Sequence, residues 1–323
     1  QLSGLNARFT GELLWHRRFI NDNGLIFSPL LSMVANSFFI APHQQARYFI
    51  PLQLYPTAGV DVRYPLFISA AHTHHILEPE IQILSTRNEI ENKPLSNEQN
   101  QSFVFDASNL FSINKFSGAD RIEGGTRANI GLHYLGQFDS GYSFYALLGQ
   151  SFHLAGKNSF ASQLLTPQSG LDKASSDYVG FLSAATASGL SLNSSLRLGN
   201  KNANLHRFNL ELVKNMQAYG ANISYTYVDK QLQDYYNQTN HALGLNGYLN
   251  LSKKWTLQGG SHYDIAKHKF INFTTGVDYH NDCLHLNLSY TQDRPLFSAT
   301  YTKTLGFHIA LRTLTDFGQN LAL

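Results

Sequence analysis

Apolar and polar positions alternate with a period of two residues through much of the second half of the chain. That period sends successive side chains to opposite faces of a β-strand. Turn residues separate the alternating stretches, as expected of an antiparallel meander. The apolar sets are Leu190, Leu192, Leu196 and Leu198; Phe208, Leu210 and Leu212; Tyr219, Ala221, Ile223, Tyr225 and Tyr227; Leu243, Leu245, Leu249 and Leu251; and Leu284, Leu286, Leu288 and Tyr290.

The first 84 residues also favour strands, with a less regular pattern. Residues 2–15 and 25–40 are predicted to pair through a polar turn. Residues 48–54 and 60–68 are predicted to form a second pair, with residues 55–59 as their turn. The most polar segment, residues 87–101, is predicted to be a long extracellular loop, because bacterial barrels place their long loops outside.

The polar partners of the alternating apolar sets are mostly Asn, Ser, Thr and His, whereas a soluble sandwich usually exposes Lys and Glu. Charged residues make up only 14% of the chain and aromatic residues 13%, while the mean hydropathy is -0.23. Since Arg or Lys on a lipid face near mid-bilayer costs roughly 2–4 kcal/mol, apolar faces that lack both favour lipid contact. We therefore predict an all-β fold, an antiparallel transmembrane β-barrel with apolar faces toward lipid and polar faces toward the lumen. Hairpins of roughly 20–24 residues give about 14–16 strands.

Several other features agree with this fold. The aromatic residues near segment ends suit interfacial girdles; they are Tyr142, Tyr178, Tyr219, Trp255 and Tyr279. The net charge of +2 is too small to indicate a nucleic-acid partner. The longest uncharged run, residues 25–46, contains prolines and amides and is better explained by two strands than by a membrane helix. The chain starts at Gln1 without a signal peptide, so we expect a segment of a longer exported protein.

One stretch, residues 106–132, gathers charges of both signs in a chain that is otherwise poor in charge. Such a set can neutralise itself in a confined wet space, and Gly118, Gly124 and Gly125 allow backbone turns. We predict a loop folded against the lumen, followed by a strand with Ile130 and Leu132 on one face and Asn129 and His133 on the other. The charged residues are Asp106, Lys115, Asp120, Arg121, Glu123 and Arg127.

Catalytic and metal-binding patterns are weak. The chain contains no Gly-x-Ser-x-Gly, His-Glu-x-x-His or phosphate-binding glycine loop. His262 with Asp264, and Asp278 with His280, would each share a strand face, but no nearby serine completes a hydrolase site. The histidines of residues 72–75 have no Cys, Asp or Glu at useful ligand spacing. We predict no catalytic residues, no metal site and no cofactor.

The charged stretch resembles a known family. Asn109-Leu110-Phe111, followed by residues 116–124 with the sequence Phe-Ser-Gly-Ala-Asp-Arg-Ile-Glu-Gly, is similar to a segment of the outer-membrane lipopolysaccharide-assembly family LptD. Leu77-Glu78-Pro79 resembles a strand of the same family. The resemblance implies residues 1–323 as the C-terminal barrel domain, an open or partial barrel without the early strands and periplasmic domain that would precede it.

The C-terminal region carries a second resemblance. Residues 304–311 resemble the signal read by the barrel-assembly machinery, and residues 305–318 resemble the C-terminal end of the family. The resemblance implies that this last strand forms one side of a lateral gate. The signal residues are Thr304, Gly306, Phe307, Ile309 and Leu311.

The family implies an activity and partners. We expect lipopolysaccharide to be inserted into the outer leaflet of a Gram-negative outer membrane, with an LptE-type lipoprotein in the lumen and periplasmic bridge proteins bound through the missing domain. Cys283, the only cysteine, cannot form an internal disulfide, and the resemblance implies a partner outside this chain. A porin-like channel and, less favoured, an outer-membrane hydrolase remain alternatives; a porin would conduct ions without a lipoprotein.

Overall fold

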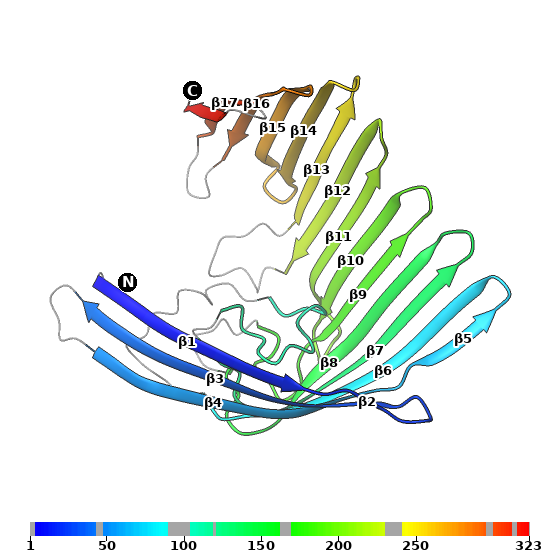
Figure 1. Ribbon diagram of the computed structural model, residues 1–323, viewed down its shortest axis with the longest axis vertical. Helices are drawn as coiled ribbons and strands as arrows, with labels where there is room; N and C mark the ends of the chain where they lie inside the picture. Colours follow the sequence, from blue (N-terminus) through cyan, green and yellow to red (C-terminus); the bar gives the residue numbers. More distant parts are fainter. Residues whose placement is uncertain are drawn as a thin grey trace. The chain divides into compact units, whose positions relative to one another are not determined.

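Strands make up most of the described part of the chain. The computed structural model describes residues 4–42, 48–89, 104–118, 121–161, 169–229, 241–294, 300–311 and 315–322, and these contain 18 strands and no helix (Figure 1). The strands are β1 (Gly4–His16), β2 (Phe19–Ile20), β3 (Ile26–Pro42), β4 (Tyr48–Arg63), β5 (Leu66–Ala70), β6 (Thr73–Thr86), β7 (Gly125–Phe138), β8 (Ser143–Ala155), β9 (Tyr178–Ala185), β10 (Leu190–Leu198), β11 (Leu205–Asn215), β12 (Tyr219–Val228), β13 (His241–Asn250), β14 (Trp255–Asp264), β15 (Lys269–His280), β16 (Leu284–Asp293), β17 (Thr302–Leu311) and β18 (Thr315–Ala322).

The chain divides into two compact units. Unit 1 comprises Gln1–Gly136, Tyr145–Phe181 and Arg197–Asn204, and unit 2 comprises Gln137–Phe144, Leu182–Leu196 and Leu205–Leu323. Unit 1 therefore holds β1 to β6, and unit 2 holds β11 to β18. Strands β7 to β10 contribute residues to both units.

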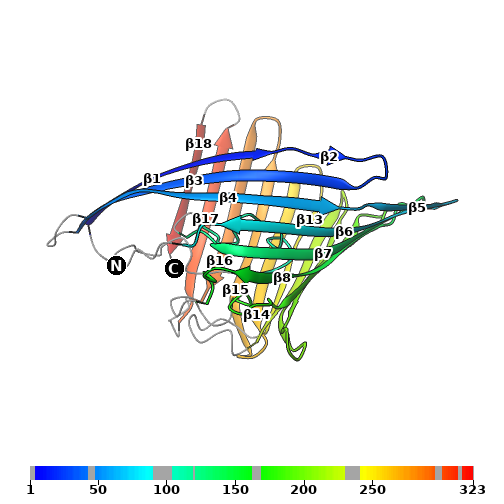
Figure 2. The same ribbon diagram turned by 90° about the horizontal axis from the view of Figure 1, so that it is seen from below.

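The first strands of unit 1 form antiparallel ladders that prolines interrupt. β1 and β2 pair with β3 in one continuous register, and β4 and β5 do the same with β6 (Figures 1 and 2). The gap after β1 faces Pro29 and the gap after β4 faces Pro79; their carbonyls accept bonds from the backbone amides of Arg17 and Tyr64. Because proline has no N–H, it cannot return the second bond of either pair.

These continuous ladders explain the strand count. β1 and β2 lie along one line of the ladder with β3, and β4 and β5 lie along one line with β6. Each of these two pairs therefore counts as one long, interrupted strand. The 18 strands of the described residues thus correspond to 16 long strands, which is the upper end of the predicted range of about 14–16. The antiparallel all-β prediction is confirmed.

The predicted turn at residues 55–59 is wrong. Residues 48–63 form the single strand β4, which pairs with β3 along most of its length. The pairing Met33↔Pro56 continues the ladder through the proline, and Gly59 packs against the side chain of Leu84 on β6. Residues with turn propensity are therefore held in the strand by pairing on both sides, which local sequence does not report.

Unit 2 is a meander in which neighbouring strands keep their apolar residues on one face. Leu286 lies opposite Ile309, and Leu288 opposite Phe307. On the other face of the same strands, Asn287 lies opposite His308. Leu288 is 53% exposed, as expected of a side chain that contacts lipid rather than a protein core. The predicted alternation in β16 is confirmed.

The predicted aromatic residues lie at strand ends or, for Tyr142, directly before the start of β8. Tyr178, Tyr219 and Trp255 begin β9, β12 and β14. Trp255 pairs across strands with Tyr279, near the end of β15, and their ring centroids are 4.8 Å apart. Both ring systems contribute apolar area next to polar termini, the arrangement favoured at a membrane interface.

Candidate functional site

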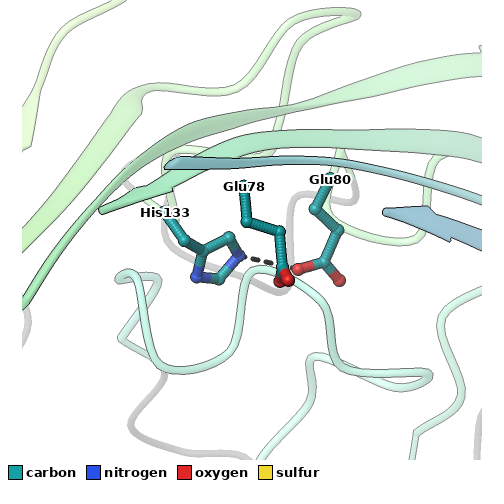
Figure 3. Close-up of side chains that lie close together, drawn as sticks. All are labelled: Glu78, Glu80 and His133. Carbon is teal, nitrogen blue, oxygen red and sulfur yellow. Dashed lines mark hydrogen bonds and ion pairs between the residues drawn. The ribbon is translucent and has the colours of Figure 1, made fainter. Parts of the chain in front are cut away.

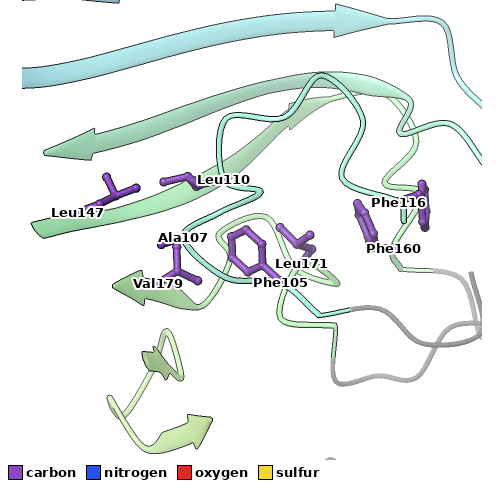
Figure 4. Packing of buried hydrophobic residues seen from close by; sticks show 8 residues of the cluster. All are labelled: Phe105, Ala107, Leu110, Phe116, Leu147, Phe160, Leu171 and Val179. Atoms are coloured by element: carbon purple, nitrogen blue, oxygen red, sulfur yellow. The ribbon is translucent and has the colours of Figure 1, made fainter. Parts of the chain in front are cut away.

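A segment between β6 and β7 packs on one face of unit 1. Residues 104–118 form a buried apolar cluster with β8, β9 and the chain between those two strands (Figure 4). One glycine on each of β7 and β8 leaves room for the segment: a methyl group added at Gly131 would lie 2.8 Å from the Phe111 ring, and one added at Gly149 would meet the Leu110 side chain. The cluster consists of Phe105, Ala107, Leu110, Phe116, Leu147, Phe160, Leu171 and Val179.

Three charged side chains anchor the same segment. Glu123 lies 3.4 Å from Lys115 Nζ and 3.4 Å from Arg127 Nε. The Arg127 guanidinium also donates to the carbonyls of Glu123 and Ile113. Lys115 and Arg127 are 2% and 1% exposed, so all three charges are held away from bulk water.

Neutral polar groups extend this network to the strands. Lys115 donates to Asn129 Oδ1 at 3.1 Å, and Ser151 on β8 donates to the same oxygen at 2.6 Å. Asn129 in turn donates to Gln82 on β6 at 2.7 Å, and Gln82 donates to the carbonyl of Phe111 at 3.0 Å. Gln82 on β6 and Asn129 on β7 are thereby bonded directly to the inserted segment, and Ser151 on β8 is linked to it through Asn129.

Burial affects the charge of Lys115, which lies outside the strands. Loss of solvation lowers the pKa of Lys115 from 10.5 to about 8, although the nearby Glu123 carboxylate acts in the opposite direction. Arg127 adds to the lowering by like-charge repulsion. A buried ammonium group therefore persists near neutral pH chiefly because Glu123 stabilises it.

Arg121 belongs to a separate ion pair. Its guanidinium donates to both carboxylate oxygens of Glu89 at 2.8 and 2.7 Å, and to the carbonyl of Ser159 at 2.8 Å. The guanidinium also lies over the Phe116 ring, 4.5 Å from its centroid. This geometry ties the chain after β6 to the chain after β8, with an aromatic surface beneath the cation.

The six charged residues predicted as one group thus divide. Lys115, Glu123 and Arg127 form one network, whereas Arg121 pairs with Glu89. Asp106 accepts bonds from the backbone and hydroxyl of Ser108 at 2.8 and 2.6 Å, an Asx-type turn. Asp120 lies outside the described residues.

A second polar cluster was missed from the sequence (Figure 3). Glu80 on β6 is 1% exposed; it lies 2.9 Å from Arg63 Nη2 and 2.7 Å from His133 Nε2. Arg63 also contacts Asp61 at 2.7 Å and Glu78 at 3.9 Å. The sequence placed His133 on a polar strand face, but it gave no register that would bring β7 to Glu78 and Glu80.

The other histidine patterns resolve into local contacts. His74 bonds with Ser69 at 3.0 Å, and His75 bonds with the Tyr134 hydroxyl at 2.9 Å. Asp278 bonds with His285 on β16 rather than with His280, the residue with which it was predicted to share a strand face. His74, His75 and His285 thus each bond to a residue of a neighbouring strand.

The predicted C-terminal strand is β17, but it is not the last. β18 follows and pairs with β17 through Ile309↔Phe317 and His308↔Gly318, so β17 is bonded on both sides. The prediction that residues 304–311 form the final strand is therefore wrong, because residues 315–322 continue the ladder. Thr304, Gly306, Phe307, Ile309 and Leu311 all lie within β17.

Cys283 is exposed in the turn between β15 and β16, where its backbone amide donates to Asn281 at 2.9 Å.

Across the part of the chain that the structure describes, no helix is long and apolar enough to cross a membrane.

Antiparallel strands with exposed leucines and aromatic ends, and with polar residues on the opposite face, define the class of outer-membrane β-barrel proteins. Within that class, the chain belongs to the LptD family: the family described as "LPS transport system D" matches residues 4–255. The protein is accordingly a lipopolysaccharide-transport protein of the outer membrane.

Solved structures add distant likenesses. A triple mutant of the Rhodopseudomonas blastica porin is 8% identical, with a TM-score of 0.36, over 84% of this chain and 86% of the porin. The ferric enterobactin receptor PfeA is 10% identical, with a TM-score of 0.46, over 98% of this chain and 56% of the receptor. No curated protein sequence matches the chain significantly.

Proposed function

We propose that the protein inserts lipopolysaccharide into the outer leaflet of the Gram-negative outer membrane through a lateral opening between strands. Membership of the lipopolysaccharide-transport family supports the substrate. The observation that carries the mechanism is the division of strand faces, seen where Leu288 is exposed and Asn287 faces the opposite way. An amphiphile needs both surfaces, since its sugars require a polar route and its acyl chains require lipid.

The lateral opening uses a strand edge. A fully paired strand in lipid is costly to separate, because each unsatisfied backbone group costs several kcal/mol. A weakly paired seam opens at lower cost. We assign one side of that seam to β18, which follows β17 in the ladder.

The same proposal includes the family's partners. An LptE-type lipoprotein would occupy the lumen, and periplasmic bridge proteins would deliver lipopolysaccharide through a domain outside residues 1–323. The barrel-assembly machinery would read β17 during folding. The protein would act as a transporter rather than as an enzyme.

Photocrosslinking in cells tests the seam. A photoreactive residue at Gln319 on β18 should form lipopolysaccharide adducts that require continuing delivery from the periplasm. A photoreactive residue at Leu257, on the exposed face of β14, is the matched control and should meet only resident lipid. Adducts at both positions that persist after delivery stops would contradict a seam at β18.

Depletion of the full-length protein separates transport from a passive channel. Newly made lipopolysaccharide should then fail to reach the cell surface, as measured by surface labelling. Normal surface arrival, accompanied by reduced uptake of small solutes, would instead indicate a porin.

A further inference from the structure

The cluster missed from the sequence presents three metal-ligating groups together. Glu78 and Glu80 are two positions apart on β6, so they share a strand face, and His133 reaches them from β7. One ligand atom from each residue lies within 4.8 Å of the others (Figure 3). Zinc bonds of about 2.1 Å in a tetrahedron separate donor atoms by roughly 3.4 Å, a distance that small side-chain rotations can reach.

The histidine is held in an orientation suited to ligation. Its Nδ1 bonds with the Tyr145 hydroxyl at 2.9 Å, while its ring stacks on Phe111 with centroids 5.7 Å apart. Nε2 is therefore the atom directed at Glu80. Metal-binding histidines are commonly fixed in this way, through a bond from the second ring nitrogen.

The local charge favours a cation. Three carboxylates, those of Asp61, Glu78 and Glu80, surround the single guanidinium of Arg63. Without a charge on His133, these four contacting groups carry an excess of two negative charges, while Arg17 and Arg18 line the adjoining cavity. Because buried charge is costly unless compensated, a divalent cation would balance the excess.

An ion has a route to the cluster. Glu78, whose side chain is 22% exposed, lines a cavity of ≈ 750 Å³. Its other polar lining residues include Asp61 and Gln82 and the three arginines Arg17, Arg18 and Arg63. Arg63 lies 3.9 Å from Glu78, beyond hydrogen-bond distance, so the Glu78 carboxylate has unused acceptor capacity. The cavity can supply water for the remaining coordination position.

We propose that Glu78, Glu80 and His133 bind a first-row divalent cation of the zinc type. The nitrogen ligand favours Zn²⁺ over Mg²⁺ or Ca²⁺, which prefer oxygen ligands alone. Binding replaces the His133–Glu80 hydrogen bond with two metal bonds, and Nδ1–H then donates to Tyr145. The cation would join β6 to β7 beneath the inserted segment, a role separate from lipopolysaccharide transport.

The test uses full-length protein in detergent, stripped with a chelator and titrated with Zn²⁺. Wild type should bind one equivalent, and Glu78→Gln should weaken binding at least tenfold while retaining heat-modifiable mobility. His74→Asn and Glu12→Gln, a histidine and a carboxylate of unit 1 outside the cluster, should bind as wild type does. Absence of binding in wild type, unchanged affinity in Glu78→Gln or lost affinity in His74→Asn would each overturn the site.

Cobalt gives a second measurement that does not need a variant of His133. Co²⁺ bound to wild type should show the visible absorption of a four- or five-coordinate site with a nitrogen ligand, and Zn²⁺ should displace it. A spectrum typical of six oxygen ligands would contradict the assignment.

Discussion

At the scale of single residues, Lys115, Glu123 and Arg127 place two positive charges and one negative charge where water is excluded. Removing one partner of a buried ion pair is more damaging than replacing the whole set, because the remaining charge is left uncompensated. Asn129 Oδ1 also accepts hydrogen bonds from the buried Lys115 ammonium group and from Ser151, which helps to replace the solvation that Lys115 loses. The network is therefore expected to fix the position of the inserted segment on the strands.

The lowered pKa of Lys115 gives a stability prediction with a definite sign. Below pH 8 the lysine is protonated in both states, so its burial opposes folding fully. Between pH 8 and 10.5 the folded protein loses this proton first, so unfolding takes up a proton and stability rises with pH. The full change is on the order of 3 kcal/mol.

The measurement is denaturant unfolding in detergent across this pH window. Wild type should gain stability relative to Lys115→Met as the pH rises. Lys201→Met, which removes an exposed lysine, should keep the wild-type slope. A constant difference between wild type and Lys115→Met would show that Lys115 does not titrate in this range.

At the scale of elements, β17 continues the apolar face of β16, because Ile309 lies opposite Leu286 and Phe307 lies opposite Leu288. Gly306 is buried on the opposite face, next to Ser289 in the register. A side chain at Gly306 and a charge at Ile309 would therefore disturb both sides of the strand. The resemblance to an assembly signal concerns the same residues.

Replacing both Gly306 and Ile309 by Asp should lower the amount of assembled protein at least fivefold, because a charge on the lipid face is unfavourable. Heat-modifiable mobility measures assembly, and periplasmic proteolysis is the expected fate of the remainder. Thr302→Asp, at the exposed start of β17, is the control. Normal assembly of the double variant would exclude both the signal and the lipid-facing role.

At the scale of the whole molecule, the prediction concerns Cys283, which is exposed. An unpaired thiol is a liability in the oxidising periplasm. We expect a disulfide with a cysteine in the family's N-terminal domain. Closure of so long a loop would contribute on the order of 4–5 kcal/mol in the chain-entropy model.

Non-reducing electrophoresis of the full-length protein checks this bond. Cys283→Ser should change the mobility, and the difference should disappear after reduction. Alkylation provides the converse measurement: a free thiol in assembled wild type, with mobility identical to that of Cys283→Ser, would rule the disulfide out.

The sequence by itself determined the strands whose two faces differ strongly in polarity. One example is β16, where Leu286 and Leu288 alternate with His285 and Asn287. It also located the aromatic strand ends and the family motif. Alternation is a local property with a period of two, so it needs no knowledge of the neighbouring strand. The class of protein followed from the same local pattern.

The tertiary structure decided which residues meet. It kept residues 48–63 in one strand, separated Arg121 from Lys115 by giving each a different carboxylate, and added β18 after β17. It also brought His133 to Glu80, 53 positions earlier in the chain. Register between strands depends on pairing and packing across the sheet, and a one-residue shift would reverse every face; that is why these contacts could not be predicted from the chain alone.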